Sequence, residues 1–89
     1  MFTITPAEIK TVKAAVIKRA MGVEPSASKV DSFVVVSLTS DGNFTSAIVS
    51  HENRLFAGAA KRNPKDAANQ AIGDRIAIAR AMRRAVEPR

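Results

Sequence analysis

The chain has 89 residues, which allows one small domain, and 46% of its residues are hydrophobic, which argues against wholesale disorder. It contains no Cys, so disulfides and thiolate metal sites are excluded. The net charge is +6 and is uneven: residues 1–50 hold five Lys and Arg against four Asp and Glu, whereas residues 51–89 hold nine against four. This excess predicts an anionic partner, most simply nucleic acid; the alternative is a solvated basic face that maintains solubility.

The first predicted element is a helix over residues 6–21. Thr5 is a good N-cap, Pro6 suits the first helical position, and Glu8 stands three residues after the cap, which is the pattern of a capping box. Gly22 is a natural C-cap. Residues 22–29 contain Gly, Pro and Ser and are predicted to form a loop.

Three strands are predicted next, over residues 30–38, 44–50 and 54–62. The Asp41-Gly42 pair favours a tight hairpin between the first two. Alternation in the first strand places Val30, Val34, Val36 and Leu38 on one face and Phe33 and Val35 on the other. Gly58 stands among alanines in the third strand, and this small-residue strip predicts that a helix crosses closely there.

The last predicted element is a helix over residues 64–86, with Asn63 as N-cap and Pro64 at its first position. Its apolar residues recur at helical spacing and form one broad face. Arg75 projects into that face. We expect it to extend to water along its own stem; it could instead pair with an acid from the first helix or lie where the two helices separate.

The order helix, three strands, helix predicts a single α+β domain over residues 1–89. We expect an α-β-β-β-α two-layer sandwich, a three-stranded antiparallel sheet with both helices on one face. The other face would then be exposed in a monomer, with Phe33 and Val35 or their neighbours on it. Exposed contiguous apolar surface marks interfaces, so Phe33 and Val35 are predicted to form a homodimer or protein contact.

Cationic side chains gather in two places. Lys61, Arg62 and Lys65 surround the start of the last helix, where free backbone N–H groups also suit a phosphate. Arg80, Arg83 and Arg84 follow on that helix and form either a second phosphate-contacting strip or a solvated face. These six residues are the predicted nucleic-acid contacts.

Motifs for chemistry are absent from the sequence. The single His cannot form a metal-binding His pair, no carboxylates are paired by spacing, and the four Gly are isolated rather than gathered in a phosphate loop. We therefore expect no enzymatic activity, no metal and no cofactor. The N-terminus lacks a secretory signal, and no stretch is long and apolar enough to span a membrane, so we expect a cytoplasmic protein without a membrane partner.

The order of elements resembles that of the double-stranded-RNA-binding domain. Residues 33–82 also resemble a family of small, largely uncharacterised proteins of actinobacteria and their phages described as having that fold. The likeness rests on the small-residue third strand and on three short motifs. These are Arg62-x-Pro64-x-Asp66, Ile72-Gly73-Asp74-x-x-Ala77 and Ala79-Arg80-Ala81.

The RNA-binding domain has a Lys-Lys-x-Ala-Lys motif at the start of its second helix, where the lysines meet phosphates. Aligned on Ala67, this chain retains only Lys65 of the three lysines. The loop over residues 40–44 also lacks the domain's Gly-Pro-x-His pattern. Duplex RNA binding of the domain's usual kind is therefore not favoured.

Two functions remain open. The first is a small basic, non-enzymatic module that binds RNA or DNA through the cationic residues at the start of and along the last helix. The second is a protein-interaction module or homodimerising regulator, of phage or host, that uses the open face of the sheet.

Overall fold

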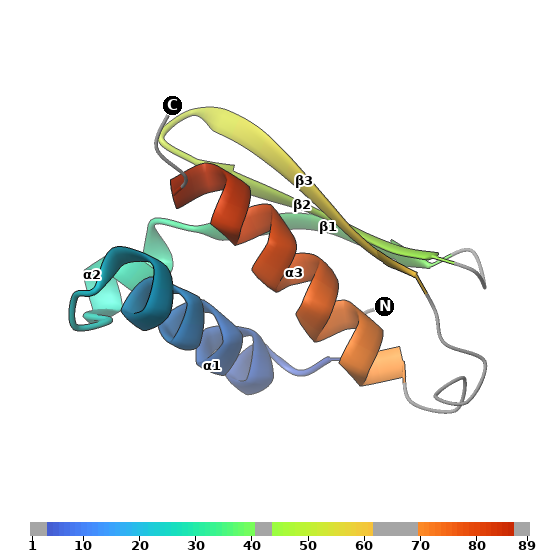
Figure 1. The fold of residues 1–89 in the computed structure, drawn as a ribbon, viewed down its shortest axis with the longest axis horizontal. Helices are drawn as coiled ribbons and strands as arrows, with labels where there is room; N and C mark the ends of the chain where they lie inside the picture. Colours follow the sequence, from blue (N-terminus) through green and yellow to red (C-terminus); the bar gives the residue numbers. More distant parts are fainter. Residues whose placement is uncertain (1–3, 41–43, 62–69, 87–89) are drawn as a thin grey trace.

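The computed structural model describes residues 4–40, 44–61 and 70–86. The elements follow in the order α1 (Pro6–Val16), a π-helical turn η1 (Ile17–Met21), α2 (Ala27–Asp31), β1 (Val34–Ser40), β2 (Phe44–His51), β3 (Arg54–Lys61) and α3 (Gln70–Val86). The strands form one antiparallel sheet in the order β1-β2-β3, and α1 and α3 lie on the same side of it (Figure 1). The predicted α+β class and two-layer arrangement are confirmed.

The first helix begins and ends where the sequence predicts. The Thr5 side chain accepts a hydrogen bond from the Glu8 backbone N–H at 3.2 Å, and Pro6 occupies the first turn. Gly22 ends the helical run with a φ of 67°, a left-handed conformation that favours glycine. The last turn, η1, is π-helical rather than α-helical.

The segment between the first helix and the sheet differs from the prediction. The Ser26 side chain accepts a hydrogen bond from the Lys29 backbone N–H at 3.3 Å and caps the short helix α2. This helix takes Val30 into the core, with 7% of its surface exposed. The predicted loop over residues 22–29 therefore contains the start of a helix, and the first strand begins at Val34 rather than at residue 30.

A β-bulge decides which side chains of β1 face the helices. Val35 pairs with Val49 and Leu38 with Ala47, and the register shifts between Val35 and Ser37. Because a bulge inserts one extra residue, it reverses the alternation of side chains along the strand. Val35 and Leu38 both pack against the core, so the predicted face shared by Val34, Val36 and Leu38 is wrong for Leu38.

Helix α3 crosses the sheet at Gly58, as the small-residue strip predicts. A Cβ atom built on Gly58 would lie 2.5 Å from the Ala77 carbonyl oxygen and 2.9 Å from the Arg80 carbonyl carbon. Only glycine permits this approach between strand and helix backbones. Behind the crossing lies one continuous core, whose largest fully buried side chains are Phe33, Ile17, Ile78, Met82 and Val49.

Candidate nucleic-acid interface

Four of the six predicted nucleic-acid contacts lie in the described part of the chain. Lys61 is exposed at the end of β3, and Arg80, Arg83 and Arg84 are exposed in the second half of α3. The other two predicted contacts, Arg62 and Lys65, and the predicted helix start at Asn63 and Pro64, lie outside the described residues.

Lys61 and the last arginines do not form one patch. Helix α3 runs opposite to β3, with Ala77 and Ala81 over Gly58 in the middle of the strand (Figure 1). Arg83 and Arg84 lie more than half a helical turn beyond this crossing, toward the N-terminal end of β3 at Arg54. Lys61 lies at the opposite end of the strand. Among the described residues, Lys61 is therefore separate from Arg83 and Arg84.

Arg80 has a structural role that the sequence does not suggest. Its Nη1 donates a 2.7 Å hydrogen bond to the carbonyl oxygen of Ala59 on the edge strand β3. An edge strand offers free backbone groups to any other strand, and a side chain that occupies one of them discourages edge-to-edge pairing. Arg80 thus covers part of the β3 edge, and only its remaining donors are open to a ligand.

Arg83 and Arg84 point in different directions. Arg83 lines a groove between the first helix and α3, whereas Arg84 is exposed and does not line it. Successive helix residues are separated by about 100° around the axis, so a single helix face cannot hold both.

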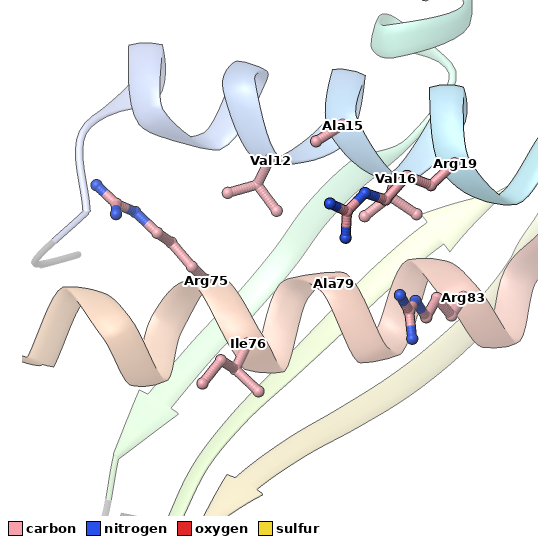
Figure 2. A pocket seen from close by; sticks show the side chains of 8 residues that line it. All are labelled: Val12, Ala15, Val16, Arg19, Arg75, Ile76, Ala79 and Arg83. Carbon is pink, nitrogen blue, oxygen red and sulfur yellow. The ribbon is translucent and has the colours of Figure 1, made fainter. Parts of the chain in front are cut away.

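The groove runs between two parallel helices (Figure 2). From the first helix come residues at helical spacing, Val12, Ala15 and Arg19; from α3 come Arg75, Ile76, Ala79 and Arg83. It has a volume of about 330 Å³ and an apolar floor. Figure 2 shows Arg75 near one end, and Arg19 and Arg83 near the other.

One end of the groove is neutralised by an ion pair. Arg75 Nη2 donates to Glu8 Oε2 at 2.8 Å, and the two side chains are 50% and 34% exposed. The expectation that Arg75 extends to water on its own is wrong, because it pairs with an acid from the first helix. The hydrogen bond and charge of Arg75 hold the pKa of the Glu8 carboxyl below its usual value of 4.5, against the opposing effect of burial.

The lowered pKa of Glu8 predicts an acid-sensitive contribution to stability. This contribution is present above pH 4.5 and is lost as the pH falls through the folded-state pKa, because the folded carboxyl must then be protonated. Arg75→Gln is expected to remove it, so the variant's melting temperature falls less steeply than wild type between neutral and acidic pH. Thermal melts followed by circular dichroism test this. Arg84→Gln is the matched control and should keep the wild-type slope; the same slope for Arg75→Gln would contradict the assignment.

The other end of the groove carries two arginines and no acid. Neither Arg19 nor Arg83 is paired with a carboxylate within residues 4–40, 44–61 and 70–86. Both lie near the C-terminal ends of parallel helical segments, where the helix dipoles favour positive side chains. Arg19 is not among the six predicted contacts, although the spacing of Glu8, Val12, Ala15 and Arg19 is that of one helix face.

The predicted interface residues lie on the helix side of the sheet. Phe33 is 1% exposed in the core and precedes β1, and Val35 packs partly buried against the same core. The assignment of Phe33 and Val35 to an open face is therefore corrected. The exposed large apolar residues of the strands are Val34, Val36, Phe44 and Leu55.

Among the described residues, no cluster of three or more His, Asp or Glu could hold a metal ion. The side chain of His51 is only 15% exposed, and its ring stacks on Phe33 with centroids 3.9 Å apart. Its Nδ1 donates to the carbonyl oxygen of Ser32, the C-cap of α2, at 3.2 Å, so it joins β2 to the end of that helix. No helix in the described part of the chain is long and apolar enough to cross a membrane.

A family model described as Rv2632c-like matches residues 32–86, which is more than half of the chain. No curated protein and no solved structure matches. The matched region contains the whole sheet and α3 and excludes α1, so the α1 side of the groove lies outside it.

Proposed function

The chain belongs to the Rv2632c-like family, and we propose that it acts as a small basic, non-enzymatic module that binds nucleic acid. The observation that carries this proposal is the cationic end of the helix layer, defined by Arg19, Arg83 and Arg84. All three side chains are exposed, and within the described residues none has a carboxylate partner. Guanidinium groups that are not engaged by a carboxylate are well suited to bind phosphate.

The net charge of +6 favours a partner that carries many negative charges along its length over a single small anion. A nucleic acid presents closely spaced phosphates along its length, so it can contact the cationic end and the separate Lys61 together. Contacts of this kind position the protein without reading sequence, because they engage the backbone rather than base edges.

We also propose that the fold is related to the double-stranded-RNA-binding domain and that the chain, like the proteins it resembles, comes from an actinobacterium or one of its phages and is cytoplasmic. In this chain the proposed contacts Arg83 and Arg84 lie in the second half of α3, whereas the domain places its lysines at the start of that helix. The proposed contact surface therefore differs from the usual one, and both RNA and DNA are to be tested.

Replacing both arginines at the end of α3 is expected to weaken binding. The double variant Arg83→Gln/Arg84→Gln should lose roughly ten- to a hundredfold in affinity for duplex RNA or DNA at low salt. The slope of log affinity against log salt should fall in magnitude by close to two units, one for each lost phosphate contact. Fluorescence anisotropy with labelled duplexes and single strands, titrated with salt, measures both quantities.

The matched control is Lys10→Gln/Lys29→Gln, which removes the same charge from two other exposed positions. It should retain more of the affinity and nearly all of the slope. Equal losses of affinity in the two double variants would mean that binding depends only on net charge and not on the cationic end. If the protein binds no nucleic acid at low salt, the proposal is wrong.

A second candidate function is self-association through the open face of the sheet. Val34, Val36, Phe44 and Leu55 are 52%, 53%, 46% and 68% exposed. Exposed large apolar side chains gathered on one face mark interaction sites in soluble proteins. The residues that pair across the strands on this face carry one charge, Lys61, and no acid, so two copies can meet there with little charge repulsion.

If this face forms a homodimer, Leu55→Lys should shift the protein to monomer without lowering its melting temperature, because Leu55 makes no core contact. Sedimentation equilibrium over a range of concentrations measures the shift. Ile76→Lys is the matched control, since Ile76 is also an exposed apolar residue, at 39%, but belongs to the helix layer. A wild-type protein that stays monomeric at high concentration would exclude the homodimer.

A further inference from the structure

The groove between α1 and α3 has a shape in which a third helix could pack. The side formed by α1 and η1, from Glu8 to Arg19, spans three helical turns, about 16 Å at 1.5 Å per residue. A second depression of about 410 Å³ continues it past the ion pair, with Ala7 and Thr11 in its lining. Ala15 and Ala79 occupy the centre on opposite sides (Figure 2). Small residues there let another backbone approach to the usual distance between packed helices.

The floor of the groove is apolar, and part of the apolar surface beside it is exposed. Val12 and Ala79 are partly buried against the core, and Ile76 at the edge of the groove remains 39% exposed. Ile72, one turn earlier on α3, is exposed to the same extent. An amphipathic helix normally turns such residues toward a partner, so this side of α3 has apolar surface that no described element of the chain covers.

The charged residues along the groove determine which charge a bound partner must carry. Glu8 is the acid in the lining of the two depressions, and it already pairs with Arg75. Arg19 and Arg83 at the other end have no carboxylate partner among the described residues. A ligand that lies along the groove must therefore be apolar in its middle and negatively charged where it meets these two arginines.

From this shape and charge we propose that the groove between α1 and α3 docks an acidic amphipathic helix of a partner protein. Apolar side chains at helical spacing cover Val12, Ala15 and Ala79, and Asp or Glu at one end pairs with Arg19 and Arg83. Helix-in-groove recognition of this kind uses anchors at positions i, i+3 or i+4, and i+7.

Two other classes of ligand fit the groove less well. A nucleic acid would leave the apolar floor uncovered, because the lining has no aromatic side chain on which a base could stack. A free fatty acid has the right chemistry, but the groove is open along its length, and small ligands are held where most of their surface is buried.

The test is a selection of about 16-residue helical peptides from a displayed library with randomised exposed positions, followed by anisotropy measurements on the selected peptides. Enriched peptides are expected to be acidic and amphipathic. Arg19→Glu/Arg83→Glu should weaken their binding by at least about tenfold. Ala15→Lys should weaken it as well, although it adds positive charge, because its long side chain obstructs the groove. Arg84→Glu is the matched control on α3 and should bind nearly as wild type.

Positions 15, 19, 83 and 84 are all exposed, so the variants should fold, and circular dichroism verifies this. The absence of enriched peptides, enrichment of basic ones, or acidic peptides that bind the groove variants as tightly as wild type would each overturn the proposal. Binding of dodecanoate in the groove without enrichment of any helix would overturn it in favour of a lipid. The peptides carry no phosphate, so the result does not depend on nucleic-acid binding.

Discussion

Gly58→Ala is expected to destabilise the protein by about 3 kcal/mol, a large part of the stability of a domain of this size. The added methyl carbon would lie 2.5 Å from the Ala77 carbonyl oxygen and even closer to the Ala81 backbone nitrogen. Both neighbours are backbone atoms of α3, so no side chain can rotate away, and the helix must move off the sheet. Urea denaturation followed by circular dichroism measures the loss.

The control is Ala57→Val in the same strand. Ala57 is exposed, pairs with Ile48 across the strands and faces away from α3, so a larger β-branched residue should change stability by less than about 0.5 kcal/mol. A Gly58→Ala variant as stable as wild type would mean that α3 does not contact β3 through its backbone.

Phe33→Ala is expected to cost about 3–5 kcal/mol, the range for a buried phenylalanine reduced to alanine. Phe33 is 1% exposed and stacks in parallel on the His51 ring, so its removal opens a cavity and uncovers the imidazole. Chemical denaturation measures the change, at low temperature if the variant is partly unfolded at 25 °C.

Leu55→Ala provides the comparison for Phe33→Ala. Leu55 is 68% exposed, so its truncation should change stability by less than about 0.5 kcal/mol. If Phe33 instead formed an exposed contact, both variants would be equally stable, and only self-association would differ between them. Equal stability would therefore restore the original assignment of Phe33 to an interface.

The parts of the fold that were correctly predicted rest on local chemistry. Thr5, Pro6 and Gly22 set the limits of the first helical run through capping and backbone geometry that involve only nearby residues. Gly58 predicted the helix crossing because a strand rarely carries glycine among alanines without a close neighbour.

The errors arise where one residue changes the pattern or where distant residues meet. The bulge near Val36 reverses the alternation of β1, and an unbroken apolar run gives no sign of it. The same run of apolar residues gives no sign that Val30 belongs to a short helix, which Ser26 caps. Periodicity places a side chain on a face, but it does not say which residues from elsewhere in the chain cover that face.

The candidate site depends on such distant pairs. Glu8 and Arg75 are 67 positions apart in the sequence, and Arg80 and Ala59 are 21 apart. These contacts divide the arginines of α3, which look alike in the sequence, into one that neutralises an acid, one that covers a strand edge, and two that remain for a ligand. Asp74, in the Ile-Gly-Asp motif, is buried, with only 2% of its surface exposed.

The most direct test of the central claim is a map of amide chemical shifts during titration of isotope-labelled protein with a duplex RNA of about 16 base pairs and with DNA of the same length. The proposed function predicts that the shifted amides gather at η1 and the last two turns of α3, around Arg19, Arg83 and Arg84. Shifts confined to the open face of the sheet, around Val34 and Leu55, would contradict it.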